Sequence, residues 1–99
     1  MRIAVDAMGG DHAPAEIVAG AIAASSHVHG NIVLVGDPSR IEACLKGHVP
    51  TNIDIHPASE VVGMDDKPME AIRKKKDSSL AVGVQLVKDG QADALVSAG

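Results

Sequence analysis

The sequence has 99 residues, a formal net charge of -4 at pH 7 and 45% hydrophobic residues, yet it contains no Phe, Tyr or Trp. A chain of this length can form one small domain whose core is built from aliphatic side chains. The acidic charge and the lack of aromatic rings disfavour nucleic-acid binding, which depends on basic surfaces and base stacking. Cys44 is the single cysteine, which excludes an internal disulfide and is typical of a cytoplasmic protein.

An apolar run near the start of the chain ends at Asp6 and is followed by Gly9-Gly10 and by Pro14. This run is too short for a signal peptide or a membrane span, which agrees with a cytoplasmic location. The order of the residues indicates a buried strand, a tight glycine loop and the start of a helix. Because ligands of open α/β sheets bind beyond the carboxyl ends of the strands, we expect the segment from Asp6 to His12 at the functional edge.

The rest of the chain alternates helix-period segments with short aliphatic runs. Helices are predicted over residues 14–26 and 38–46, from residue 68, and over residues 78–89, and strands over residues 32–35, 53–56 and 94–96. Asp37 is the expected N-cap of the second helix, and Cys44 is expected on the buried face of that helix. In the last helix we expect Leu80, Val84 and Val87 to face inward.

This order of elements predicts an α/β fold with a mainly parallel sheet, helices on both faces and right-handed crossovers. The final predicted strand leads into Ser97-Ala98-Gly99. A parallel strand ordinarily delivers a loop to the ligand edge and continues into a helix. We therefore expect the sequence to stop within a motif.

Three motifs, in order and spacing, carry a resemblance to a known family. They are Asp6-Ala7-Met8-Gly9-Gly10-Asp11, then Pro68 to Ser79, and then Ala92 to Gly99. Together they resemble the amino-terminal portion of the acyl-carrier-protein-dependent phosphate acyltransferases of bacterial phospholipid synthesis, called PlsX. The resemblance extends over the whole chain, so residues 1–99 are expected to be the amino-terminal part of a single α/β catalytic domain, truncated relative to the family.

The resemblance implies that a long-chain acyl group is transferred from acyl carrier protein to inorganic phosphate, which yields an acyl phosphate for phospholipid synthesis. It also implies a three-layer αβα fold similar to the isocitrate and isopropylmalate dehydrogenases and to phosphotransacetylase. A homodimer that associates peripherally with the inner face of the membrane is implied as well. No cofactor is expected.

Inorganic phosphate is anionic and nucleophilic near neutral pH, so the protein need only position it and stabilise the thioester oxyanion. Gly9 and Gly10 allow close backbone approach to an anion, although two glycines also form an ordinary strand-to-helix turn. Asp6 and Asp11 would repel phosphate, so they are expected to orient a donor, cap a helix or bind a cation. His12 is either a general base or a structural residue. These side chains lack a further metal ligand, so no metal site is predicted.

Arg73 and Lys76 are the candidate cations, because helical spacing places them on one stripe. They are expected to hold phosphate or to meet the acidic surface of acyl carrier protein, and the alternative is a solvated helix face. Ser78 and Ser79 are expected to cap the following helix, and their hydroxyls and the free amides of that helix can also bind an anion.

Ser97 lies just after the last predicted strand, at the ligand edge, without the G-x-S-x-G motif of serine hydrolases. The predicted catalytic residues are Asp6, His12 and Ser97, and the predicted substrate- or phosphate-binding residues are Gly9, Gly10, Asp11, Arg73, Lys76, Ser78, Ser79 and Gly99. Two other functions stay open. A dehydrogenase is disfavoured because Gly9-Gly10 is not the G-x-G-x-x-G fingerprint, whereas a non-catalytic assembly segment would pair through exposed sheet edges.

Overall fold

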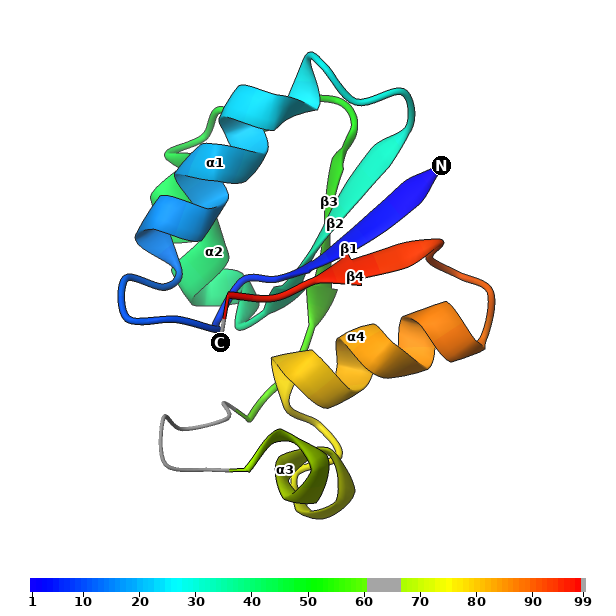
Figure 1. Cartoon of the computed structure of the whole chain (residues 1–99). Helices are drawn as coiled ribbons and strands as arrows, with labels where there is room; N and C mark the ends of the chain where they lie inside the picture. The colour runs from blue at the N-terminus through cyan, green and yellow to red at the C-terminus, as the bar shows by residue number, and fades with distance from the viewer. Residues whose placement is uncertain (61–66, 99) are drawn as a thin grey trace.

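The computed structural model describes residues 1–60 and 67–98, and Figure 1 shows the arrangement of their elements. The strands are β1 Arg2–Asp6, β2 Asn31–Gly36, β3 Ile53–Pro57 and β4 Ala94–Val96, and the helices are α1 Ala15–Ser25, α2 Pro38–Leu45, α3 Pro68–Lys74 and α4 Ser79–Lys88. The predicted alternation of strands and helices is confirmed within these residues. No helix among them is long and apolar enough to cross a membrane.

The strands form one four-stranded sheet in the order β3-β2-β1-β4, and every pairing in it is parallel. β1 lies inside the sheet, with Ile3 opposite Ile32 of β2 on one side and Ala94 of β4 on the other. α1 and α2 cover one face, whereas α4 covers the other face and α3 packs against α4 (Figure 1). This confirms the predicted α/β fold, and the layers are consistent with a three-layer αβα arrangement.

The aliphatic run of β2 fills both layers of the core. Leu34 belongs to the cluster that contains Val18 of α1 and Ile41 of α2, whereas Val33 belongs to the cluster that contains Leu86 of α4. Successive strand residues point to opposite faces, so a run without polar interruptions is what a strand covered on both sides requires. Each such large aliphatic side chain stabilises the fold by about 1.5–3 kcal/mol when it is buried.

The first two helices begin close to where the sequence predicts. α1 starts at Ala15, one residue later than predicted, because Pro14 occupies the N-cap position. The predicted cap of α2 is confirmed, since the Asp37 carboxylate accepts a hydrogen bond from the Ser39 N–H at 3.0 Å. Cys44 is half-buried beside the core cluster under α1 and α2.

The predicted inward face of α4 is wrong. Val87 is 36% exposed, and the helix instead buries a face that includes Gly83 and Leu86. The reason is close packing of small residues on the sheet, because a Cβ at Gly83 would lie 2.6 Å from the Leu95 side chain of β4. A pattern of large aliphatic residues therefore does not identify the buried face of a helix that approaches its sheet this closely.

Candidate functional site

Asp6 ends β1 and lies at the centre of a buried hydrogen-bond cluster. Its side chain is 4% exposed. Oδ1 accepts hydrogen bonds from the Met8 N–H at 3.1 Å and from the Ser79 hydroxyl at 2.5 Å, and Oδ2 accepts one from the Ser97 hydroxyl at 2.8 Å. One carboxylate thus joins the glycine loop, the start of α4 and the end of β4. We call Asp6, Met8, Ser79 and Ser97 the Asp6 cluster.

The parallel sheet explains why these residues meet. β1 and β4 are neighbouring parallel strands with Val5 opposite Val96. Asp6 and Ser97 are the next residues along each strand, so they lie beside each other at the carboxyl edge of the sheet. Ser79 is the first residue of α4, which packs across β1 and β4 and begins at this edge (Figure 1). A buried carboxylate is tolerated because hydrogen bonds to both of its oxygens replace water.

The glycine loop is shaped by the same carboxylate. A Cβ at Gly9 would lie 2.6 Å from Asp6 Oδ2 and 3.1 Å from Ser97 Oγ, so a side chain has no room there. Gly10 has a φ of +99°, a backbone conformation that L side chains rarely adopt. The two glycines are therefore required for different reasons, close approach at Gly9 and backbone geometry at Gly10.

A shallow hollow of about 210 Å³ lies on this loop. Asp11 and His12 are exposed residues of its lining, and Ala98, which follows β4, also lines it. The lining consists of Gly9, Gly10, Asp11, His12, Ala13, Glu16, Ile17 and Ala98. The structure thus brings four predicted site residues together around this hollow, Gly9, Gly10, Asp11 and His12, and three more, Asp6, Ser79 and Ser97, in the neighbouring Asp6 cluster.

Ser78 and Ser79 are fully buried, and their polar atoms bond within the protein. The predicted cap is confirmed for Ser78, whose hydroxyl oxygen accepts a hydrogen bond from the Ala81 N–H at 3.1 Å. The backbone N–H of Ser79 donates to the carbonyl of Glu60 at 3.1 Å, and its hydroxyl donates to Asp6. These contacts fix the start of α4 against the Asp6 cluster.

Asp77 fastens the loop that precedes α4. Its carboxylate accepts hydrogen bonds from the Ser59 hydroxyl and from the Ser59 N–H, the latter at 2.9 Å. These bonds, with a smaller contribution from the charge of His56, hold the pKa of Asp77 below its usual value. Because Asp77 and Ser59 belong to the segments on either side of residues 61–66, the pair connects the end of β3 to the start of α4.

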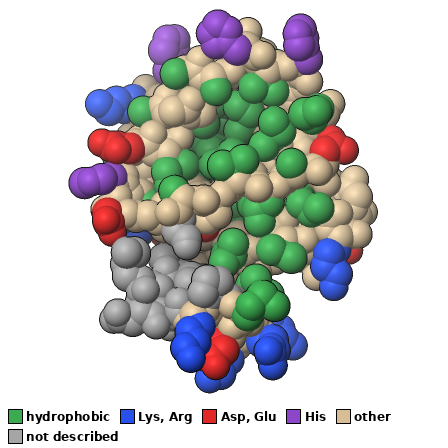
Figure 2. Space-filling view, viewed as in Figure 1, with side chains coloured by type: hydrophobic (Ala, Val, Ile, Leu, Met, Phe, Trp, Pro, Cys, Tyr) green, Lys and Arg blue, Asp and Glu red, His purple; other side chains and the backbone are tan. Residues whose placement is uncertain are grey.

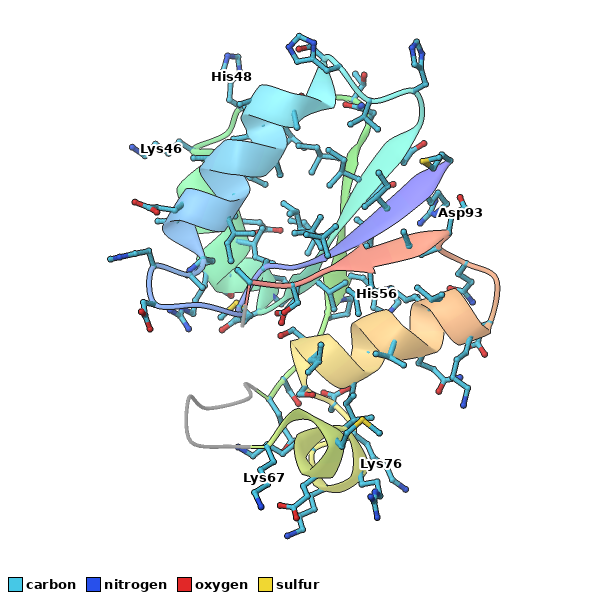
Figure 3. All side chains as sticks on the ribbon, viewed as in Figure 1. Lys46, His48, His56, Lys67, Lys76 and Asp93 are labelled. Carbon is cyan, nitrogen blue, oxygen red and sulfur yellow. The ribbon has the colours of Figure 1, made fainter. Side chains whose placement is uncertain are left out.

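Arg73 and Lys76 lie elsewhere. Both are exposed and line a hollow of about 570 Å³ between α3 and α4, which shares no lining residue with the hollow on the glycine loop. Lys76 projects at the α3 end of the molecule, where Lys and Arg side chains gather (Figures 2 and 3). The predicted helical stripe through both residues is wrong, because α3 ends at Lys74. Gly99 lies outside the described residues.

The sequence assigns Asp6, Ser79 and Ser97 to one site, but it does not give the hydrogen bonds that join them or the pairing of Ser59 with Asp77. Short polar side chains at the end of a buried strand and at the start of a helix were the available signal, but they do not identify a partner 73 residues away. Among the residues that the structure describes, no three His, Cys, Asp or Glu side chains come together as metal ligands.

The fold and the site define a small α/β domain with polar groups gathered at the carboxyl edge of a parallel sheet. A family model described as "Fatty acid synthesis protein" matches residues 1–99, and the chain belongs to this family.

The chain is similar to several proteins named phosphate acyltransferase. It is 58% identical over 100 residues to that of Desulfitobacterium hafniense (strain DSM 10664 / DCB-2) and 57% identical over 102 residues to that of Heliobacterium modesticaldum, and both alignments cover 100% of this chain. The protein of Gloeothece citriformis is 54% identical over 99 residues, or 99% of this chain. The chain spans 30%, 30% and 28% of the lengths of these relatives, respectively.

Proposed function

We propose that the full-length protein carrying this sequence transfers a long-chain acyl group from acyl carrier protein to inorganic phosphate. The observation that carries the proposal is the Asp6 cluster, which joins all three motifs of the resemblance at one sheet edge in a chain whose relatives are named phosphate acyltransferase. A phosphate oxygen attacks the thioester carbonyl, the carbon–sulfur bond breaks, and the carrier thiolate leaves and takes up a proton. The products are an acyl phosphate and the free thiol.

In this proposal the hollow on the glycine loop receives the phosphate. Gly9 and Gly10 line it without side chains, so an anion could approach the peptide N–H groups closely. Asp6 acts as a positioning residue, because its two oxygens already accept hydrogen bonds from within the protein. His12 is an exposed residue of the lining and is the candidate for proton transfer, while Asp11 shapes the opening.

Ser78 and Ser79 support this site from below, since their buried hydroxyls hold α4 against Asp6. Arg73 and Lys76 are assigned to the acidic acyl carrier protein. Their separation from the hollow on the glycine loop favours this role over phosphate binding. Exposed cations attract an acidic partner over a long range, so they need not lie next to the phosphate site.

The wider context follows the resemblance. Residues 1–99 form the amino-terminal part of one catalytic domain whose completed fold is similar to the isocitrate dehydrogenases. The full-length enzyme acts as a homodimer in the cytoplasm and associates peripherally with the membrane. The absence of a spanning helix among the described residues is compatible with that association.

The test is acyl phosphate formation by the full-length protein from long-chain acyl carrier protein and phosphate. Phosphorus NMR should show an acyl phosphate only when phosphate is present, in an amount equal to the carrier thiol released. Thiol release without acyl phosphate would mean thioester hydrolysis and would overturn the proposal. The control is the same assay without the protein, which measures the uncatalysed reaction.

A second candidate function is assembly, and one observation favours it. An apolar hollow of about 310 Å³ lies between α1 and the edge strand β4, lined by residues such as Ile3, Ile17 and Val96 (Figure 2). Val96 is 55% exposed. If the chain serves assembly alone, substitution of His12 in the full-length protein would leave acyl phosphate formation unchanged, whereas Val96→Glu would abolish it together with folding.

A further inference from the structure

We infer that the apolar hollow between α1 and β4 receives a helix from a later part of the full-length protein, separated from residue 99 by at least one further strand. The inference concerns an interaction surface and does not depend on the proposed reaction. It follows from an incomplete helix layer over the sheet, from the chemistry of the hollow, and from the direction of the crossovers.

The helix layer on the α1 side of the sheet covers only part of it. α1 packs mainly over β2 and β3, and α2 packs over β3. Val5 of β1 and Val96 of β4 lie opposite each other on this side, because they alternate with Ala4 and Leu95, which belong to the cluster under α4. Val96 is 55% exposed. Parallel sheets carry helices on both faces, so this side lacks its cover over β1 and β4.

The uncovered part is the apolar hollow of about 310 Å³ (Figure 2). Its walls are residues of α1, such as Ile17 and Ala24, and residues of the strands, such as Val5 and Val96. Among the described residues that line it, none has a polar or charged side chain. A charged ligand finds no partner group here, whereas the apolar face of an amphipathic helix removes this surface from water.

The direction of the crossovers indicates which segment provides this helix. From β1 through β2 to β3 the chain moves toward one edge of the sheet, and α1 and α2 lie on one face. From β3 the chain returns to β4 at the opposite edge, and α4 lies on the other face. Parallel crossovers keep one hand, so the direction of a connection decides the face on which its helix lies.

A connection from β4 to a parallel strand beyond it would continue in the direction from β3 to β4. Its helix would therefore lie on the α4 face and not in the apolar hollow. The helix beside α1 must belong to a connection that runs in the opposite direction, between strands that come later in the chain. This is why we place at least one further strand between residue 99 and that helix.

The full-length protein has enough chain to supply this helix, since the 99 residues span 30% of the length of the Desulfitobacterium hafniense relative. A second copy of the chain has no described helix to insert, because α1, α2 and α4 pack on their own sheet and α3 packs on α4. Ile17 lines both the apolar hollow and the hollow on the glycine loop. The later helix therefore borders the glycine loop as well.

The test places a photoreactive diazirine amino acid at residue 24 of the full-length protein. Ala24 is exposed and lines the hollow. After irradiation, we expect mass spectrometry to find crosslinks from residue 24 to a peptide of the same chain that lies beyond the first strand after residue 99. The control is the same amino acid at Ala23, which is also exposed on α1 but does not line the hollow. One residue turns the side chain by about 100° around the helix, so residue 23 should not crosslink to that peptide.

A mixture of unlabelled and isotope-labelled protein separates crosslinks within one chain from crosslinks between copies. Mixed pairs at residue 24 would make the hollow a dimer interface and would overturn the inference. Crosslinks to the segment that directly follows residue 99 would overturn the argument from the crossovers. Irradiation that yields no peptide crosslink at residue 24 would show that the hollow is open.

A thermal unfolding measurement provides a second test. Ala24→Glu would bury a charge under the later helix, so it should lower the Tm of the full-length protein by at least about 5 °C, whereas Ala23→Glu should change it by less than about 2 °C. Both alanines are exposed in the structure of the 99 residues. Equal shifts in the two variants would therefore overturn the inference. If Ala24→Glu fails to fold, the crosslinks from residue 24 decide.

Discussion

The Ser79 hydroxyl donates a hydrogen bond of 2.5 Å to the carboxylate of Asp6, and both side chains are buried although 73 residues separate them in the sequence. The bond joins the end of β1 to the first residue of α4. Since the third partner, Ser97, follows β4, the carboxylate connects each of the three motifs that mark the chain. The site and the fold therefore depend on the same atoms.

Removal of the Asp6 carboxylate should destabilise the protein strongly. In Asp6→Ala, the Met8 N–H and the Ser79 hydroxyl lose their acceptor in a buried place. We expect a loss of about 2–4 kcal/mol in the free energy of unfolding, measured by urea titration. Asp54→Ala is the matched control on β3, because that side chain is exposed, and it should change stability by less than about 0.5 kcal/mol. Equal losses in both variants would contradict the hub role of Asp6.

Gly9→Ala should disturb the Asp6 cluster by direct contact. The new methyl group would lie 2.6 Å from Asp6 Oδ2, so the carboxylate or the loop must move. We expect a loss of about 1–3 kcal/mol in stability together with weaker phosphate binding, measured by urea titration and calorimetry.

Gly20→Ala provides the control for Gly9→Ala. Gly20 lies inside α1 with nothing within 4 Å of a new Cβ, so alanine should stabilise the helix by about 0.5–1 kcal/mol and leave phosphate binding unchanged. If Gly9→Ala changes stability and phosphate binding no more than Gly20→Ala does, the close approach of Gly9 to the carboxylate is not needed for either.

The local parts of the fold were predictable, and the parts that depend on distant partners were not. The Asp37 cap and the doubly covered strand β2 follow from short sequence patterns, and the structure confirms both. The buried face of α4 does not follow from such a pattern. The close contact of Gly83 with Leu95 favours small residues over large ones on that face.

The candidate site divides in the same way. Proximity of Asp6 and Ser97 follows from two parallel strands that end at one edge, and sequence analysis placed both residues there. The hydrogen bond from Ser79 depends on the packing of α4 across the other face of the sheet, which no local pattern encodes. For the same reason, the position of Arg73 away from the glycine loop could not be predicted.

The pairing of Asp77 with Ser59 should appear as a pH effect. The hydrogen bonds from Ser59 lower the pKa of Asp77 from its ordinary value of 3.8. A lowered pKa means that the ionised carboxylate stabilises the folded state above that value, and that this contribution is lost as the pH falls through the folded-state pKa. Ser59→Ala should raise the pKa of Asp77 toward 3.8, measured by carboxyl-carbon NMR titration.

The backbone N–H of residue 59 still donates in that variant, so the shift should be only partly lost. Ser39→Ala, at an exposed serine of α2, serves as the control and should leave the Asp77 titration unchanged. A titration of Asp77 that Ser59→Ala does not move would show that the side-chain hydrogen bond is absent in solution.

Arg73 should act on the carrier-bound substrate. It is exposed beside Lys76 in the hollow between α3 and α4, away from the glycine loop. In the full-length protein, Arg73→Ala should raise KM for acyl carrier protein by about three- to tenfold at low ionic strength, with KM for phosphate unchanged. Added salt should shrink the difference between parent and variant, because screening weakens the attraction between exposed charges.

Arg40→Ala is the control for Arg73→Ala, since it removes an exposed arginine from α2 on the other face of the sheet. It should leave both KM values at those of the parent, at low and at high salt. A rise in KM for phosphate in Arg73→Ala would contradict this assignment and show that Arg73 contributes to phosphate binding. The rest of the full-length enzyme, outside these 99 residues, would then have to bring Arg73 and the glycine loop together. Unchanged kinetics with both substrates would make Arg73 an ordinary solvated residue of α3, and the carrier protein would then dock elsewhere.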